Sequence, residues 1–142
     1  MLFSKATEYA IRALVYIASL DRKPGFKEIA REIDAPEPYT AKILQTLSRK
    51  GLLNSAKGPG GGFYIDKGKP PLLLKDVVQA MEGDDILRKC GLGLKNCSDE
   101  NPCPIHDQYA RIREEINRMV STKTIQTLAQ KLKDGEAIIM RP

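Results

Sequence analysis

Proline and glycine divide the first 65 residues into short segments, and this division limits what the chain can fold into. Pro24-Gly25 separates an apolar-periodic stretch over about residues 4–20 from a shorter one over 26–33. The turn Asp34–Pro38 leads into a third stretch over 38–50, which is followed by a glycine. Apolar residues recur at steps of three and four in each stretch, which indicates three amphipathic helices. The second and third helices, joined by a tight turn, are typical of a helix-turn-helix.

A glycine-rich turn follows the third predicted helix. The segment Lys57-Gly-Pro-Gly-Gly-Gly62 lies between two short runs that are rich in strand formers, Leu52–Ala56 and Phe63–Ile65. A flexible linker is the alternative interpretation, but the flanking residues and the stiffness of Pro59 favour a β-hairpin. A hairpin directly after a helix-turn-helix is the wing of a winged-helix domain.

The second half of the chain contains further helical patterns on either side of an aperiodic segment. Leu74, Val77, Val78 and Met81 mark a helix that ends at Gly83. Residues 84–104 have no helical or strand period, so we expect an irregular loop there. A long helix with a strong apolar stripe follows, and then another helix over about 122–133. Three consecutive apolar residues lie near the end of the tail. The stripe consists of Tyr109, Ile112, Ile116, Met119 and Val120, and the tail of Ile138, Ile139 and Met140.

These patterns predict a mainly α fold with a small β-hairpin. We expect a winged helix-turn-helix DNA-binding domain over residues 1–83 and a cysteine-rich cluster or sensor loop over 84–104. Residues 105–142 should form a dimerisation helix and a C-terminal helix. The apolar stripe of the long helix is longer than one small winged-helix core needs to cover, so we expect a second subunit to pack against it.

Positive charge is concentrated in the first half of the chain. Residues 1–70 carry 12 basic and 7 acidic side chains, whereas residues 71–142 carry 11 of each, so the first half holds the whole formal charge of +5. No acidic residue occurs between Glu37 and Asp66, an interval with four basic ones. A solvated basic face is the alternative, but such a local bias also attracts a polyanion such as nucleic acid.

One face of the third predicted helix combines basic and polar side chains. A recognition helix presents such side chains to base edges and phosphates in the major groove, so we expect Lys42 near the bases and Arg49 at a phosphate. Glycine backbone at the wing tip can approach phosphates closely, and Lys57 can reach along the minor groove. The predicted DNA-binding residues are Tyr39, Thr40, Lys42, Gln45, Thr46, Arg49, Lys57, Gly60 and Gly61.

All three cysteines lie in the aperiodic segment, close to the single histidine. Cys90, Cys97, Cys103 and His106 supply soft ligands that suit zinc or an iron-sulfur cluster. Only the last two have the close spacing of a zinc knuckle, so the looser spacing favours a cluster. Metal-free thiol sensing stays open, because the two basic residues before Cys90 favour its thiolate. Incidental cysteines are the remaining alternative, although free cysteine is usually buried among apolar residues.

Other functional classes have less support. A Cys-His enzyme that uses Cys103 and His106 lacks an orienting third group in any obvious element, so we predict no catalytic activity. The odd number of cysteines and the absence of a secretion signal or of an apolar run of about 18 residues favour a reducing, cytoplasmic setting.

The ordered combination of these motifs resembles the IscR/NsrR-type family of bacterial winged-helix iron-sulfur transcription regulators. The resemblance covers nearly the whole chain and implies a homodimer that binds double-stranded DNA at a palindromic operator. It also implies that the long C-terminal helix crosses to the partner subunit. The matching segments are Ser4-Lys5-Ala6-Thr7-Glu8-Tyr9-Ala10, the helix-turn-helix with Tyr39, the wing Lys57–Phe63, and the loop with Cys90, Cys97, Cys103 and His106.

The same resemblance implies a cofactor and its ligands. In cluster-binding members, three loop cysteines and a fourth ligand hold a [2Fe-2S] or [4Fe-4S] cluster whose state alters DNA affinity, and we favour [2Fe-2S] here. His106 matches the fourth ligand of IscR-like members, and Glu8 of the partner subunit matches a carboxylate ligand in other relatives. This chain departs from the family in having six residues rather than five between Cys90 and Cys97, and Lys57 where arginine is common.

Overall fold

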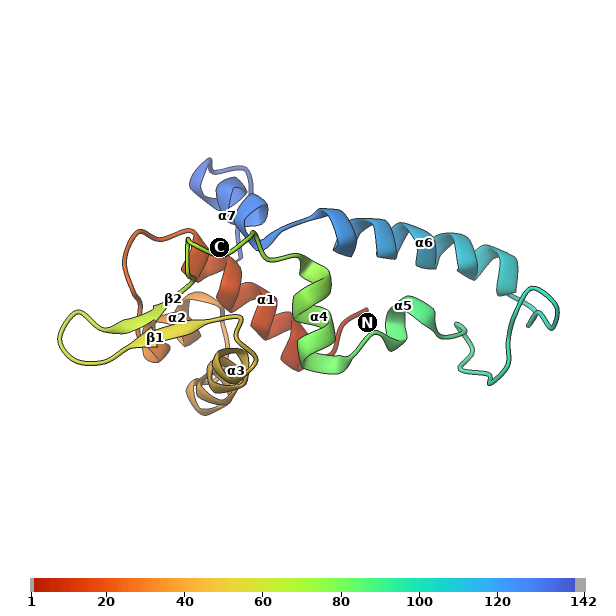
Figure 1. Cartoon of the computed structure of the whole chain (residues 1–142), viewed down its shortest axis with the longest axis horizontal. Helices are drawn as coiled ribbons and strands as arrows, with labels where there is room; N and C mark the ends of the chain where they lie inside the picture. Colours follow the sequence, from red (N-terminus) through yellow and green to blue (C-terminus); the bar gives the residue numbers. More distant parts are fainter. Residues whose placement is uncertain (1, 140–142) are drawn as a thin grey trace.

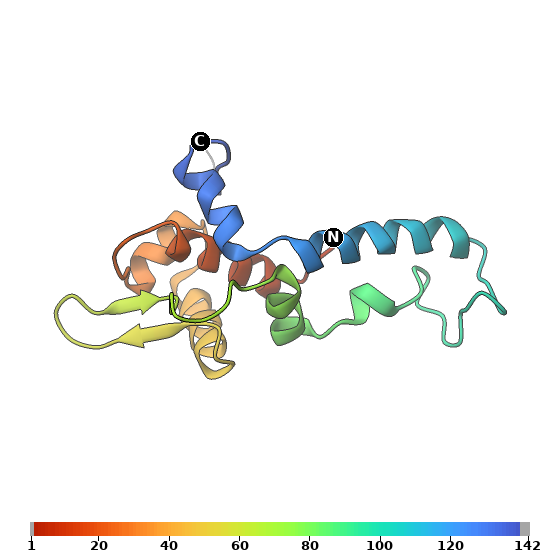
Figure 2. The same cartoon turned by 45° about the horizontal axis from the view of Figure 1, so that its top comes forward.

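The computed structural model describes residues 2–139, in which seven helices and two strands follow one another (Figure 1). The elements are α1 (Lys5–Ala18), α2 (Phe26–Glu32), α3 (Glu37–Arg49), β1 (Asn54–Ala56), β2 (Gly62–Tyr64), α4 (Leu74–Glu82), α5 (Asp85–Arg88), α6 (His106–Thr122) and α7 (Ile125–Lys133). The hairpin and the loop before α6 lie at opposite ends of the molecule in both views (Figures 1 and 2). Within the described residues, no helix is long and apolar enough to cross a membrane.

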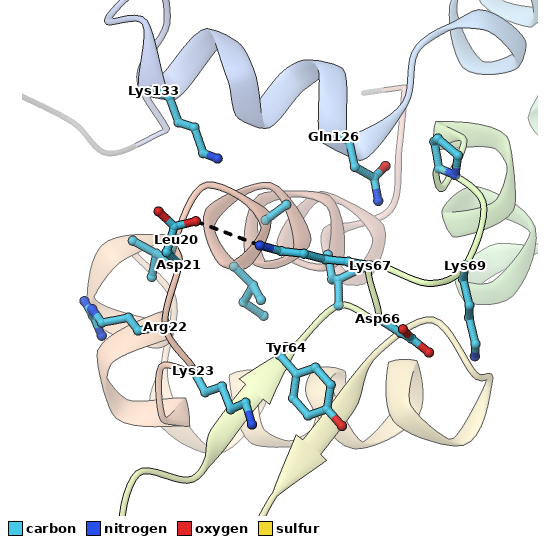
Figure 3. Close-up of a pocket in the computed structure, with 14 residues that line it drawn as sticks. Leu20, Asp21, Arg22, Lys23, Tyr64, Asp66, Lys67, Lys69, Gln126 and Lys133 are labelled. Atoms are coloured by element: carbon cyan, nitrogen blue, oxygen red, sulfur yellow. Dashed lines mark ion pairs between the residues drawn. The ribbon is translucent and has the colours of Figure 1, made fainter.

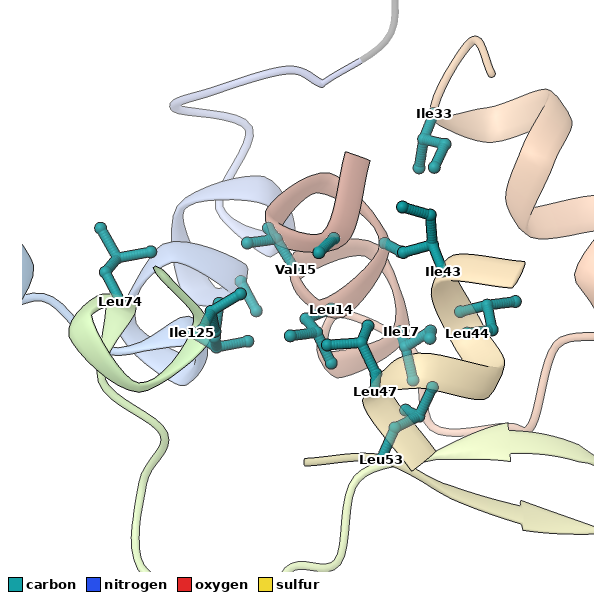
Figure 4. Close-up of a cluster of buried hydrophobic side chains, with 14 of the residues drawn as sticks. Leu14, Val15, Ile17, Ile33, Ile43, Leu44, Leu47, Leu53, Leu74 and Ile125 are labelled. Carbon is teal, nitrogen blue, oxygen red and sulfur yellow. The ribbon is translucent and has the colours of Figure 1, made fainter. Parts of the chain in front are cut away.

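Helix α1 is the central element of the core. Its first turn is capped by Ser4, whose hydroxyl accepts a hydrogen bond from the Thr7 N–H at 3.1 Å. Apolar side chains at helical spacing then pack against α2, α3, α4 and α7. Leu14 and Ile17 of α1 meet Leu47 of α3 and Ile125 of α7 in this core (Figure 4).

Helices α2 and α3 form the predicted helix-turn-helix within one residue of the expected boundaries. Ile29 and Ile33 are fully buried under α1, and Asp34 has a φ of 56°, which reverses the chain before α3. Pro38 occupies the first turn of α3, where no N–H is needed. Gly51 follows the last turn with a φ of 77°, so the expected left-handed C-terminal glycine is confirmed.

The predicted wing is a two-stranded antiparallel hairpin in which Ser55 pairs with Phe63. Its base is fixed to the loop between α1 and α2, because the Phe63 N–H donates to the Pro24 carbonyl at 2.8 Å. Gly62 lies against the same loop, and a Cβ there would be 2.2 Å from the Lys23 carbonyl oxygen. This close approach requires glycine at the start of β2.

Helix α6 projects from the body beside α4 and α5 (Figure 1). Two backbone hydrogen bonds fix the point where α6 ends and α7 begins. The Leu74 N–H donates to the Lys123 carbonyl at 3.0 Å, and the Ile125 N–H donates to the Leu72 carbonyl at 2.7 Å. Of the α6 side chains, only Val120 is fully buried within the chain. Most of the predicted apolar stripe therefore remains partly accessible.

Two details differ from the sequence-based expectations. The segment 84–104 is not wholly irregular, because Asp85–Arg88 forms the short helix α5 and buries Leu87. One helical turn is too short to produce a detectable period. Helix α7 begins at Ile125 rather than near 122, since Thr124 caps it by accepting from the Thr127 N–H. Met140 of the expected apolar tail lies outside the described residues.

Candidate functional site

The polar face of α3 is accessible as predicted. Lys42, Gln45 and Arg49 are exposed, whereas Ile43, Leu44 and Leu47 on the opposite face are buried. The half-buried Thr46 donates to the Lys42 carbonyl at 3.0 Å, and the guanidinium of Arg49 donates to the Thr46 hydroxyl at 3.3 Å. Two basic side chains thus flank a hydroxyl on one accessible surface.

Tyr39 connects the start of α3 with α1. Its ring meets the ring of Tyr9 edge to face, with centroids 5.4 Å apart. Arg12 and Lys5 lie over the Tyr9 ring at 5.3 and 5.7 Å from its centroid. The exposed tyrosine at the N-terminal end of α3 is therefore positioned by a basic and aromatic surface of α1.

Thr40 is not on the accessible face of α3, which contradicts our expectation that it contacts DNA. The residue is 1 % exposed, and its hydroxyl donates to the Pro36 carbonyl at 2.9 Å. Its position three and four residues before Ile43 and Leu44 places it on the core side of the helix. We therefore exclude Thr40 from the candidate interface, and the spacing itself contained the signal that was missed.

The wing tip presents some, but not all, of the predicted groups. Lys57 and Gly60 are exposed. Gly61 is half-buried, and its N–H donates to the Gly58 carbonyl at 2.8 Å, so this group is already engaged within the turn. A Cβ at Gly61 would lie 2.3 Å from the Ala56 carbonyl oxygen. Gly61 thus supports the shape of the wing and does not offer a free N–H to a phosphate.

The structure brings three of the four predicted metal ligands, the cysteines, together at the end of the α6 arm, and it places His106 beside one of them, Cys97. The Sγ atoms of Cys90, Cys97 and Cys103 all lie within 4.8 Å of one another. Cys90 and Cys103 are 3.5 Å apart, and His106, the first residue of α6, places Nδ1 3.3 Å from the Cys97 Sγ. No disulfide joins these half-buried thiols in the described residues.

Two further contacts within the loop shape this cluster. His106 Nε2 is 2.8 Å from the Asp99 carboxylate, a partner that sequence reasoning did not identify. The only available signal was an acidic residue two positions after Cys97. The Leu92 N–H donates to the Cys90 Sγ at 3.4 Å, and this hydrogen bond, with one from Leu94, lowers the pKa of the Cys90 thiol to about 7.

The donor set fits a soft metal. Two thiolates bound to one tetrahedral ion at about 2.3 Å lie roughly 3.8 Å apart, which is close to the spacing of Cys90 and Cys103. Three thiolates and an imidazole are ligands that both zinc and iron-sulfur clusters accept. Glu8 does not belong to the thiol cluster of its own chain, and its carboxylate is 3.7 Å from Lys5 Nζ.

Comparison with known proteins adds independent information about the chain. A model of the Rrf2 family, described as an iron-dependent transcriptional regulator, matches residues 3–131. A protein of Aquifex aeolicus, provisionally named an HTH-type transcriptional regulator, is 32% identical over 131 residues, which is 90% of this chain and 91% of the relative. Protein aau3 of Rhizobium meliloti is 32% identical over 121 residues, with 82% and 75% of the two chains covered.

Solved structures share the architecture at lower identity. CymR, the global cysteine regulator of B. subtilis, superposes with a TM-score of 0.70 at 22% identity, over 90% of this chain and 95% of CymR. IscR of T. potens also gives a TM-score of 0.70, at 18% identity, over 94% and 90% of the two chains. The predicted fold, mainly α with a two-stranded wing, is confirmed by these neighbours.

Proposed function

Because this chain belongs to the Rrf2 family of transcriptional regulators, we propose that it is a homodimeric, sequence-specific DNA-binding regulator that acts in the cytoplasm. Its DNA affinity responds to an iron-sulfur cluster held in the cysteine loop. The observation that carries this proposal is the convergence of three thiols and an imidazole in a chain that also exposes a basic recognition helix. The family consists of regulators rather than enzymes, so no catalytic role is proposed.

We assign DNA contacts to those predicted DNA-binding residues that are accessible in the structure. Lys42 reaches base edges from the first half of α3, and Arg49 contacts a phosphate at its C-terminal end. Lys57 and the backbone of Gly60 approach the neighbouring groove from the wing. Tyr39, Gln45 and Thr46 complete the interface on the same side of α3. A two-fold symmetric dimer would present two such surfaces to a palindromic operator.

Homodimerisation is supported by the unpartnered part of the α6 stripe. Ile112 is 51 % exposed and Met119 is 37 % exposed, although both belong to a helix with an apolar face. Within the chain α6 packs mainly on α4 and α5. A second copy of α6 would cover these side chains and hold two DNA-binding domains at a fixed separation.

The cofactor is assigned to Cys90, Cys97, Cys103 and His106, with [2Fe-2S] favoured over [4Fe-4S]. When bound, the cluster supplies a centre that changes with oxidation or iron loss. A non-thiolate fourth ligand makes one iron easier to lose, as a sensor requires. The runner-up for that position is Glu8 of the partner subunit.

The loop has a direct structural connection with α6 and the body. The guanidinium of Arg113 donates to the Lys89 carbonyl at 3.0 Å, next to Cys90. The Asn117 amide donates to the Leu87 carbonyl at 3.1 Å, and Leu87 itself is buried in the core. Rearrangement of the loop would therefore act on α5 and α6 together. Such a change shifts DNA affinity only if the two states bind DNA with different strength.

A second candidate function is a regulator with a single zinc ion or with metal-free thiols. The specific observation in its favour is the short distance of 3.5 Å between the sulfur atoms of Cys90 and Cys103, with the third sulfur within 4.8 Å. That spacing suits several thiolates on one tetrahedral ion.

Anaerobic purification of the full chain separates these possibilities. The iron-sulfur proposal expects visible absorption and equal amounts of iron and sulfide, and it expects each change Cys90→Ser, Cys97→Ser and Cys103→Ser to abolish them. Lys95→Gln, at an exposed position of the same loop, is the control. DNA affinity is measured with and without cluster on a duplex that the wild type selects from a random-sequence pool. Colourless protein with stoichiometric zinc favours the zinc alternative, and protein without metal favours thiol sensing.

A further inference from the structure

A cavity of about 560 Å³ lies away from both the cysteine cluster and the polar face of α3. It is open to solvent on one side and is lined by the end of α1 and the loop that follows it, by the end of β2 and the segment after it, and by α7 (Figure 3). We propose that this cavity binds a small amphipathic anion, with an apolar body and a carboxylate, sulfonate or phosphate group. None of the DNA-binding or metal-ligating residues predicted from the sequence lines it.

The lining carries more positive than negative charge. Two acidic side chains, Asp21 and Asp66, accompany five basic ones, and the basic residues are Arg22, Lys23, Lys67, Lys69 and Lys133. The Asp66 carboxylate accepts from the Gly68 N–H at 2.8 Å, so it is oriented toward its own turn. The net charge of the lining therefore favours an anion over a cation or a neutral ligand.

The basic side chains are not equally available to a ligand. Arg22 is bound to Glu28 through two hydrogen bonds of 2.6 and 2.7 Å, and Lys67 lies 4.0 Å from Asp21 in a solvent-exposed pair. Lys69 and Lys133 form no ion pair within the described residues. These two lysines are the charges that an anion would neutralise with the least competition.

A neutral donor and an ordered cation add to this lining. The Oε1 atom of Gln126 accepts from the Leu72 N–H at 3.0 Å, which fixes the amide and leaves its NH₂ group as a donor. Lys23 Nζ lies 4.6 Å from the centroid of the Tyr64 ring. In Figure 3, Gln126 and Lys133 extend from α7 toward Lys67 on the opposite wall.

Apolar side chains in the lining distinguish this cavity from a surface that binds only phosphate groups. Ile17, Leu20 and Ile65 line it together with the charged residues. The volume lies in the range of about 300–1,000 Å³ that is typical of small-molecule sites. The phosphodiester backbone of DNA has no apolar body to fill such a space, so a small ligand with both characters is the better match. Because Lys67 and Lys69 follow β2, an occupant would contact the base of the wing as well as α7.

A pair of fluorescent probes tests the proposal on the full chain. The anionic probe is 8-anilino-1-naphthalenesulfonate, and the neutral probe is N-phenyl-1-naphthylamine, which has the same rings without the sulfonate. We expect the anionic probe to saturate one site per chain in the wild type. The double variant Lys69→Gln/Lys133→Gln should weaken its binding at least about fivefold, because two exposed charges are lost. Binding of the neutral probe should not change.

The matched control is Lys123→Gln/Lys131→Gln, which removes two exposed lysines outside the cavity and should keep wild-type affinity for the anionic probe. Equal affinity of the cavity variant and the wild type for this probe would overturn the proposal, as would equal losses in the cavity and control variants. A third contrary result would show that Lys69 and Lys133 contact DNA rather than a ligand in the cavity. In that case the cavity variant keeps its affinity for the probe but binds duplex DNA more weakly and with a shallower salt dependence than the control.

Discussion

The Nδ1 atom of His106 lies 3.3 Å from the Sγ atom of Cys97. This contact joins the first residue of α6 to the middle of the cysteine loop, so the loop is attached to the helix through two of the proposed metal ligands. The opposite ring nitrogen, Nε2, is held by Asp99 at 2.8 Å, which favours a proton on Nε2 and a free lone pair on Nδ1. Asp99 thus orients the imidazole toward the thiols.

Replacement of Asp99 by alanine should loosen the metal centre without removing any ligand. A carboxylate that holds the second nitrogen of a ligating histidine typically contributes about 10–100-fold to metal affinity. We expect Asp99→Ala to release iron or zinc to a chelator at least about tenfold faster and to alter the visible spectrum of the loaded protein. Glu100→Gln, at the next exposed position, is the control. Identical release rates for Asp99→Ala and the wild type would contradict this positioning role.

Two changes on α3 should have different effects on DNA binding. Arg49→Ala should weaken binding to all sequences alike and reduce the slope of log affinity against log salt by about 1, because one phosphate contact is lost. Lys42→Ala should also relax specificity, at a cost of about 1–3 kcal/mol for the preferred sequence. Competition titrations with the selected duplex and a scrambled duplex measure both effects. If the double variant binds the selected duplex like the wild type at fixed salt, the assignment of α3 is wrong.

The helices and the wing follow from local signals, but parts of both sites do not. Pro24 marks its loop because its ring fixes φ, whereas Gly51 and most glycines of the wing mark theirs because they allow the positive φ that these turns need. The short helix α5 has no such signal, since its stability depends on burial of Leu87 by α6 and the core. Thr40 was misassigned because its hydroxyl was given more weight than its spacing from Ile43 and Leu44, which places it on the core side of α3.

The candidate sites show the same distinction between local and tertiary information. The three cysteines and His106 were proposed as metal ligands from residue type and spacing, whereas Asp99 became evident only when the loop placed it beside His106. The cavity is formed by segments that lie about 40 to 60 positions apart, near Leu20, Lys67 and Gln126. No local pattern indicates that these segments meet, because their meeting depends on how α7 packs against α1.

Changes on α6 should separate dimerisation from folding. Ile112 is 51% and Met119 37% exposed within one chain, so Ile112→Glu/Met119→Glu should give a folded monomer. Ile116 is half-buried and packs against the core of its own chain, so Ile116→Glu should instead lower the free energy of unfolding by about 2 kcal/mol or more. Sedimentation at micromolar concentration measures the first effect and denaturant titration the second. A monomeric wild type in sedimentation would refute the proposed dimer, and Gln108→Glu on the same helix serves as the control.

The contact between α1 and the helix-turn-helix should give the protein a distinct acid sensitivity. Hydrogen bonds from Arg22 and then from Tyr16 lower the pKa of Glu28 from 4.5 to about 2. A carboxyl whose pKa is lower in the folded state stabilises that state above its unfolded pKa, and the contribution is lost as pH falls. The stabilisation by Glu28 should therefore be complete above about pH 5 and disappear between about pH 4.5 and pH 2.

Glu28→Gln tests this dependence because the amide cannot ionise. Its side chain is 23% exposed, so we expect a loss of only about 1–2 kcal/mol in the free energy of unfolding at pH 7. The difference between wild type and variant should shrink as the pH is lowered toward 2, since protonation then removes the same charge from the wild type. Glu32→Gln is the control, because this half-buried neighbour makes only a 3.5 Å contact with Arg31. Denaturant titrations across this range provide the measurement, and a difference that stays constant with pH would show that Glu28 stabilises the fold through packing rather than through its charge.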